Sequence, residues 1–130
     1  MASNVPKPET IRALKESGEA GKVVMVNLLK FKAAAGVASY TEYVRRVIAI
    51  LERIRAKIVF AGPVTSAVIG EQSWDSILLV EYPSREVFVE MITSPEYQAI
   101  HHFRDDALER SELYAVSPDG GFMADAIWQS

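Results

Sequence analysis

Cysteine is absent from this sequence of 130 residues, and that absence removes several classes of protein. Without a thiol the chain has no disulfide, no thiolate nucleophile and no zinc or iron–sulfur centre held by cysteines. Basic residues are also in the minority, because 14 Lys and Arg stand against 17 Asp and Glu, for a net charge of -3. Nucleic-acid binding depends on contacts from Lys and Arg, so we expect no nucleic-acid partner.

Long apolar runs and sequence signals for targeting are missing too. No stretch approaches the roughly 18 apolar residues of a membrane span, and the start MASNVPKPET lacks the basic-then-apolar pattern of a secretory signal. The sequence contains no Gly-rich phosphate loop, nucleophile elbow or paired-carboxylate signature, and we expect no cofactor. These absences predict a cytoplasmic protein without a membrane partner.

The sequence does have the composition of one ordinary globular domain, with 49% hydrophobic and 24% charged residues and no Gly/Ser/Pro linker. We predict a single domain over residues 1–130, with a core at about residues 22–116, a leading helix within 1–21 and a tail at 117–130. The tail is apolar for an end segment. We expect burial against a partner subunit for four of its side chains, those of Phe122, Met123, Ile127 and Trp128.

The stretch from Lys57 to Tyr82 organises the rest of the chain, because it contains two apolar extended runs joined by a polar turn at residues 70–73. Gly62 and Pro63 interrupt the first run, since proline lacks a donor for the strand ladder and glycine permits a bulge. We predict that the strand bends there and continues over residues 64–69. The return strand is predicted over residues 74–82.

Apolar spacing and helix caps predict the remaining elements. A strand over residues 23–31 is apolar on both faces, and a small-residue connection leads from it to a helix over 40–54, with Ser39 and Glu42 as a possible capping box. Ser84 and Ser94 each precede a helical pattern and predict a kinked helix that ends near residue 108. A last strand is predicted over 113–116, and a leading helix over 6–18.

The order strand, helix, strand, strand, helix, strand is the ferredoxin-like βαββαβ arrangement of an α+β protein. An antiparallel sheet with helices on one face normally shows polar residues on the other. Here the return strand is apolar on both sides, with Ile77 and Leu79 on one and Leu78 and Val80 on the other. We therefore predict a homodimer in which two antiparallel sheets pair face to face as a dimeric α/β barrel.

Five stretches of the sequence carry a family resemblance: MVNLLKFK at 25–32, IVFAG at 58–62, VIG at 68–70, WDSILLVEYPSREVF at 74–88 and SPEYQAI at 94–100. Together they resemble the uncharacterised bacterial domain of unknown function 1330 family, in the dimeric α/β-barrel superfamily. The resemblance implies a ferredoxin-like subunit and a dimeric barrel, without an established activity. The superfamily includes cofactor-independent monooxygenases, haem-degrading enzymes and stress-induced barrels, so the shared fold leaves the chemistry open.

Five side chains are candidates for a substrate-binding site between the sheet and the helices: Asn27, Trp74, Tyr97, His101 and Arg104. Asn27 interrupts an apolar strand, where an unpaired buried amide would cost about 1–3 kcal/mol. It is either a pocket wall or an amide satisfied by neighbouring backbone. Trp74 opens the return strand, and it either covers a cavity mouth or is a core tryptophan followed by a solvated Asp75.

The spacing of Tyr97, His101 and Arg104 places them on one helix face. His101 is the candidate catalytic residue, because a histidine exchanges protons near neutral pH, and Arg104 is the natural partner for an anion. The alternative is a histidine at the rim and an arginine that snorkels to solvent.

His102 lies about a hundred degrees further around the helix, where we expect it to face Asp105 and Asp106. A His–Asp pair supplies two possible metal ligands. The sequence shows no pattern for the remaining ligands, so we predict no metal site.

Three hypotheses for function remain. The first is a dimeric barrel that binds a small organic molecule, either as a binding protein or as a cofactor-independent monooxygenase-like enzyme in which His101 removes a proton. The second is a non-catalytic or stress-associated dimer without a ligand cavity of roughly 300 Å³ or more. The third is an RNA-recognition module, which would need exposed aromatic residues on the sheet and a basic surface. The first strand has only Phe31, and the chain is acidic.

Overall fold

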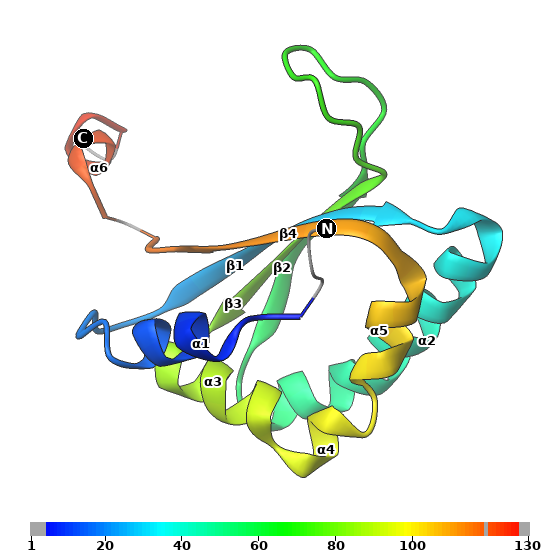
Figure 1. Ribbon diagram of the computed structural model, residues 1–130. Coiled ribbons are helices and arrows are strands. Elements are labelled where there is room, and N and C mark those ends of the chain that lie inside the picture. Colours follow the sequence, from blue (N-terminus) through cyan, green and yellow to red (C-terminus); the bar gives the residue numbers. More distant parts are fainter. Residues whose placement is uncertain (1–4, 119, 128–130) are drawn as a thin grey trace.

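The computed structural model describes residues 5–118 and 120–127 (Figure 1). One antiparallel sheet has the spatial order β2-β3-β1-β4 and consists of β1 (Val23–Phe31), β2 (Lys57–Pro63), β3 (Ser76–Tyr82) and β4 (Leu108–Val116). The helices are α1 (Pro8–Lys15), α2 (Ala33–Arg53), α3 (Arg85–Thr93), α4 (Pro95–Gln98), α5 (His101–Ala107) and α6 (Phe122–Ile127). This succession confirms the ferredoxin-like α+β prediction and the leading helix.

Alternation along the strands gives the sheet an inner and an outer face. On β1 the inner residues are buried beneath the helices, whereas the residues between them are only half-buried. Helices α1 to α5 all lie on the inner side of the sheet (Figure 1). Much of the outer face is apolar, because the strand register aligns on it Val24, Val26, Leu28, Phe60, Ile77, Leu79, Tyr114 and Val116, together with the charged residues Lys30, Glu81, Arg110 and Glu112.

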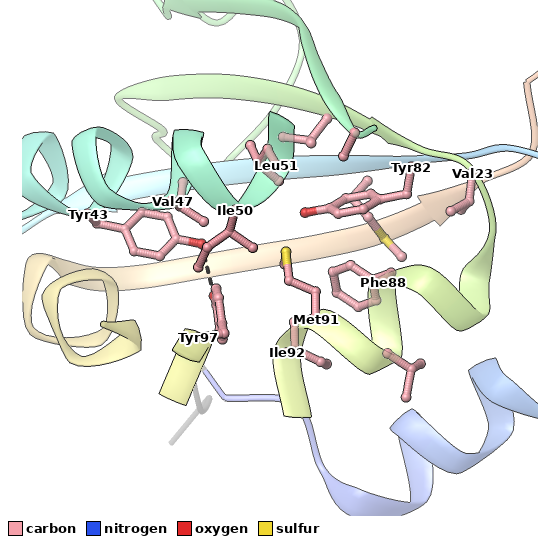
Figure 2. Close-up of a cluster of buried hydrophobic side chains, with 14 of the residues drawn as sticks. Val23, Tyr43, Val47, Ile50, Leu51, Tyr82, Phe88, Met91, Ile92 and Tyr97 are labelled. Carbon is pink, nitrogen blue, oxygen red and sulfur yellow. Dashed lines mark hydrogen bonds between the residues drawn. The ribbon is translucent and has the colours of Figure 1, made fainter. Parts of the chain in front are cut away.

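The hydrophobic core lies between the inner face and helices α2 and α3 (Figure 2). Aromatic rings pack there edge to face, as Tyr82 and Phe88 do with ring centroids 5.0 Å apart. Aliphatic side chains surround them, among them Val23, Met25, Val47, Ile50, Leu51 and Val80.

The predicted caps of the helices after β3 are present. The Ser84 hydroxyl accepts a hydrogen bond from the Val87 amide at 3.1 Å and begins α3, and the Ser94 hydroxyl accepts one from the Tyr97 amide at 3.1 Å and begins α4. Pro95 occupies the first turn of α4, where its missing N–H costs nothing. The chain breaks again at residues 99–100, so three short helices replace one kinked helix.

Helix α2 begins earlier than predicted, and the expected small-residue connection is its first two turns. Gly36 lies inside this helix. The position favours glycine, because a Cβ atom there would stand 2.5 Å from the carbonyl oxygen of Ala107. The Lys32 amide also donates to that carbonyl at 2.9 Å. The capping box was wrong, since Ser39 lies within the helix and donates its hydroxyl to the carbonyl of Phe103 at 2.7 Å.

The β2–β3 hairpin is shorter than predicted. Strand β2 ends at Pro63, and residues 64–75 form a loop in which Ile69 is 97% exposed. The predicted strand over 64–69 was wrong, because the ladder between β2 and β3 ends at the couple of Pro63 and Ser76, followed by a hydrogen bond from the Val64 amide to the Asp75 carbonyl at 2.9 Å. The register shifts at Val59, between Ile58 and Phe60, and not at the Gly–Pro pair.

Strand β4 begins at Leu108, five residues before the predicted start. It pairs along β1 as far as the couple Phe31 and Leu108. Its first half is rich in charged residues, which favour an edge strand but hide the apolar alternation. The predicted helix therefore ends one residue earlier, at Ala107.

The tail forms the short helix α6, which projects away from the rest of the subunit (Figure 1). Phe122 is 86% exposed there, and Met123 and Ile127 are exposed as well. Trp128 lies outside the described residues. No helix within residues 5–118 and 120–127 is long and apolar enough to cross a membrane.

Candidate functional site

A cavity of about 790 Å³ lies between the inner face of the sheet and the helices, a size within the range of small-molecule sites. Its walls come from the strands and from α2, α3 and α5, and residues 5–19, which include α1, close a further side. Most of the lining surface is apolar. The charged and polar side chains within it come from distant parts of the chain.

Asn27 and Arg104 meet in this cavity, and both are buried. The Asn27 amide nitrogen donates to the carbonyls of Met25 and Leu78 at 3.4 and 3.2 Å, which turns the amide oxygen away from the strand. That oxygen accepts a hydrogen bond from Arg104 Nη2 at 3.3 Å. Backbone carbonyls therefore satisfy the amide nitrogen of Asn27, while its side chain lines the cavity.

Three tyrosines lie beside Arg104. The hydroxyls of Tyr43 and Tyr97 are hydrogen-bonded at 2.9 Å (Figure 2), and Tyr40 packs on Tyr43 with ring centroids 5.3 Å apart. The Tyr40 hydroxyl is buried and has no hydrogen-bond partner of normal geometry among the described residues. Burial raises the pKa of Tyr40 to about 12, although the positive charge of Arg104 opposes this increase. Tyr40 is therefore a neutral hydroxyl at physiological pH.

His101 also lines the cavity and stacks on Tyr97 with ring centroids 6.5 Å apart. Its Nδ1 lies 2.6 Å from Asp105 Oδ2, one turn further along α5. When the carboxylate accepts the Nδ1 proton, Nε2 of the neutral ring becomes the proton acceptor. A histidine oriented in this way by a carboxylate has the arrangement of a general base.

Asp105 binds His101 and not His102, whose exposed ring lies 4.1 Å from the ring of Phe103. Among residues 5–118 and 120–127, no three His, Cys, Asp or Glu side chains are grouped so that they could hold a metal ion. The His101–Asp105 pair therefore lacks the further ligands that a metal centre would need there.

Arg85 is a second buried arginine in the lining, at the start of α3. It forms an ion pair with Glu19 at 3.1 Å and donates to the Ser117 hydroxyl at 2.8 Å. These contacts link the N-terminal segment and the end of β4 to α3. The N-terminal segment is thereby held as one wall of the cavity.

Trp74 is the candidate that the structure places apart from the others, outside the lining of the cavity. The guanidinium of Arg110 lies over its ring, 4.4 Å from the centroid. The neighbouring Asp75 is tied into the sheet, because its carboxylate accepts a hydrogen bond from the Phe31 amide at 2.9 Å. The cavity thus brings together four of the five candidates, namely Asn27, Tyr97, His101 and Arg104.

Sequence reasoning did not single out Tyr40, Tyr43, Arg85 or Asp105 as site residues. The two tyrosines lie in the helix predicted over 40–54 and read as part of its apolar side, although a buried tyrosine hydroxyl needs a partner and so signals a polar site. Arg85 and Asp105 resemble ordinary surface charges in the sequence, and only the packing of α1 on α3 and the phase of α5 place them at the cavity.

The fold and the cavity define a class of α+β proteins with helices on one face of an open four-stranded sheet. A protein of unknown function from Rhodopseudomonas palustris has this structure, with 28% identity, a TM-score of 0.83 and coverage of 91% of this chain and 98% of that chain. A dabb family protein with a ferredoxin-like fold from Mesorhizobium loti is 16% identical, with a TM-score of 0.56 over 77% of this chain and 99% of that chain. A dimeric protein of unknown function and ferredoxin-like fold from Bacteroides fragilis is 15% identical, with a TM-score of 0.53 over 73% and 94%.

The chain belongs to the family described as Domain of unknown function (DUF1330), whose model matches residues 22–117. The family resemblance found in the sequence is thereby confirmed. No protein among the curated sequences matches this chain. The family assigns no reaction or ligand, so function must be argued from the cavity and the outer face.

Proposed function

We propose that this protein is a homodimeric ferredoxin-like barrel that binds a small organic molecule in the cavity of each subunit. The observation that carries the proposal is the buried Arg104, held by Asn27 inside a cavity of about 790 Å³. A protein with a merely structural core would gain stability by filling such a space with apolar side chains. A cavity with polar groups at fixed positions is the usual form of a ligand site.

A screen of small molecules by thermal shift tests this proposal. Leu78→Trp places a large ring in the cavity, and Val37→Trp adds the same ring to an exposed position on α2. We expect ligands to raise the melting temperature of the wild type and of Val37→Trp but not of Leu78→Trp. Equal shifts in all three proteins would contradict binding in the cavity.

The outer face supports the homodimer. It presents a continuous apolar surface on which Phe60 and Tyr114 are 54% and 52% exposed, and such a surface normally marks an interface. The protein from Bacteroides fragilis, which shares this fold, is described as dimeric. Face-to-face pairing of two sheets would cover the surface and give the dimeric barrel. Light scattering should give twice the chain mass of 14.4 kDa, and a monomer would refute the assembly.

The apolar side chains of α6 support a further role of the tail in the same dimer. In Figure 1, α6 and the loop of residues 64–75 both project away from helices α1 to α5. We propose that Phe122, Met123 and Ile127 pack on the second subunit. A chain that ends at Pro118 should then dimerise more weakly than the full chain at the same concentration, as measured by sedimentation. Unchanged dimerisation would show that the tail has another use.

The His101–Asp105 pair favours a second candidate function, a cofactor-independent oxygenase. In this reaction Nε2 of His101 takes a proton from an acidic C–H or O–H group of the substrate, and the resulting anion reacts with O₂ as the oxidant. The distance of 2.6 Å between Nδ1 and the Asp105 carboxylate is the supporting observation, since it leaves Nε2 as the acceptor. The stacked Tyr97 ring holds the imidazole against the cavity.

Oxygen consumption in the presence of each molecule that binds tests this second candidate. His101→Gln should reduce the rate by about a hundredfold or more, the usual contribution of a general base. His102→Gln is the matched control, because that exposed ring packs on Phe103 outside the cavity lining, and its rate should equal the wild-type rate. No oxygen consumption by the wild type, or an unchanged rate in His101→Gln, would exclude this function.

A further inference from the structure

The charges that line the cavity differ in sign from the charge of the whole protein. The described lining contains three positive and two negative side chains, namely Lys7, Arg85 and Arg104 against Glu19 and Asp105, while the chain has a net charge of -3. Glu19 is paired with Arg85 at 3.1 Å, and Asp105 is engaged by His101 at 2.6 Å. Lys7 is exposed, so the buried cations of the lining are Arg85 and Arg104.

One group of polar side chains in the lining lies near α5, and a second, the ion pair of Arg85 and Glu19, lies at the start of α3. Arg104, Asn27 and the buried Tyr40 hydroxyl lie together beside the hydrogen-bonded pair of Tyr43 and Tyr97. From that pair the core cluster extends to Tyr82 and Phe88 at its other end (Figure 2). The lining residues along this path are apolar, namely Val47, Leu51, Val80, Met91 and Ile92. The cavity therefore has a polar region at Arg104, and apolar lining separates it from the ion pair at Arg85.

We infer that the cavity takes a small amphipathic carboxylic acid. Its carboxylate lies at Arg104 and accepts a hydrogen bond from the Tyr40 hydroxyl, and its apolar body lies between α2 and α3. The planar guanidinium of arginine matches a carboxylate in geometry, and the hydrogen bond to Asn27 holds the guanidinium of Arg104 in place. The inference rests on the proposed function and adds the chemical class of the ligand.

The test compares acids with their neutral primary amides: decanoate with decanamide, phenylpropanoate with phenylpropanamide, and naphthoate with naphthamide. Calorimetric titration of the wild type should show an acid that binds about tenfold to a hundredfold more tightly than its amide, the range of a hydrogen bond to a charged group. Arg104→Met keeps the apolar stem and removes the charge, so the acid and the amide should bind equally. Arg85→Met removes the other buried arginine of the lining and should keep the preference for the acid.

Each result has a distinct meaning. Equal binding of every acid and its amide to the wild type would overturn the carboxylate inference while the proposed function stands. A preference for the acid that persists in Arg104→Met would overturn the role of Arg104. If no acid and no amide binds, the carboxylate inference fails, and the thermal-shift screen with Leu78→Trp decides the proposed function separately. Should Arg104→Met not fold, Arg104→Lys replaces it, and acid affinity undiminished in that variant would contradict recognition by the guanidinium fork.

Discussion

The two faces of the sheet reverse the usual distribution of side chains. The outer face, open to solvent in the single subunit, is apolar from Phe60 to Tyr114, while the inner face beneath the helices holds Asn27 and lies against Arg104. Exposed apolar surface is stabilised by a partner, and buried polar groups need hydrogen bonds or a ligand. The comparison teaches that this fold separates its two proposed tasks, with assembly on one face and binding on the other.

The largest expected effect is the loss of the dimer on charging the outer face. Phe60→Glu combined with Tyr114→Glu should weaken dimerisation by several kcal/mol, because apposed like charges at an interface repel. Both side chains are more than half exposed in the subunit, so folding should persist. Val37→Glu, on the exposed side of α2, is the control and should remain dimeric in sedimentation. A charged double variant that stays dimeric would assign the interface to another surface.

Alkaline pH should lower the free energy of unfolding, because four tyrosines are buried on the inner side of the molecule. Burial raises the pKa of Tyr40 to about 12 and also raises the pKa values of Tyr43, Tyr82 and Tyr97. The unfolded chain loses these protons near pH 10 and the folded chain only at higher pH, so stability is complete below about pH 10 and falls above it. Tyr40 alone should cost about 2 kcal/mol by pH 12. Urea unfolding at stepwise pH measures this loss.

The next prediction compares the loss of stability on replacing Asn27, a polar residue on the inner side of β1, with the loss on replacing an apolar neighbour on the same strand. Asn27→Leu removes the hydrogen bond to Arg104 and leaves the carbonyls of Met25 and Leu78 without this donor. We expect a loss of about 1–3 kcal/mol in the free energy of unfolding, although leucine is more apolar. Chemical denaturation measures it, and Val26→Leu on the outer side of β1 is the control, with a smaller change expected. A stabilised Asn27→Leu variant would show that the amide serves the ligand alone.

The smallest expected effect comes from a comparison of two tyrosine hydroxyls, one buried on the inner side of the sheet and one exposed on its outer face. Tyr97→Phe removes the buried hydrogen bond to Tyr43 and should cost about 1 kcal/mol. Tyr114→Phe removes the exposed hydrogen bond to Glu112 at 2.7 Å and should change stability by less than about 0.5 kcal/mol. Thermal unfolding of both variants tests the difference, and equal losses would contradict the contrast in burial.

Much of the fold could be predicted because its signals are local. The alternation of residues 23–31 predicted β1, and Ser84 and Ser94 predicted the starts of two helices through their caps. The start of α2 was missed because a glycine inside a helix resembles a connection. Only the close approach of the Ala107 carbonyl explains why Gly36 belongs there.

The candidate site could be predicted in part. Asn27 was conspicuous as an amide in an apolar strand, and the spacing of Tyr97, His101 and Arg104 placed them together despite the break at residues 99–100. The position of Trp74 could not be read from sequence, because it depends on the stacking of Arg110 from another strand. The choice of His101 over His102 as the partner of an aspartate depended on the phase of α5 after that break.

The amino-acid sequence by itself determined the order of the elements, the two apolar faces of the sheet and the polar residue in β1, since each follows from periodicity within a few neighbouring positions. Tertiary structure alone decided that Arg104 meets Asn27, that Asp105 orients His101 and that residues 5–19 close the cavity. The first and third of these join residues far apart in the chain, whereas the second is a contact within α5 whose place at the cavity depends on the packing of that helix. Their geometry depends on how helices pack on a twisted sheet, which no local pattern encodes.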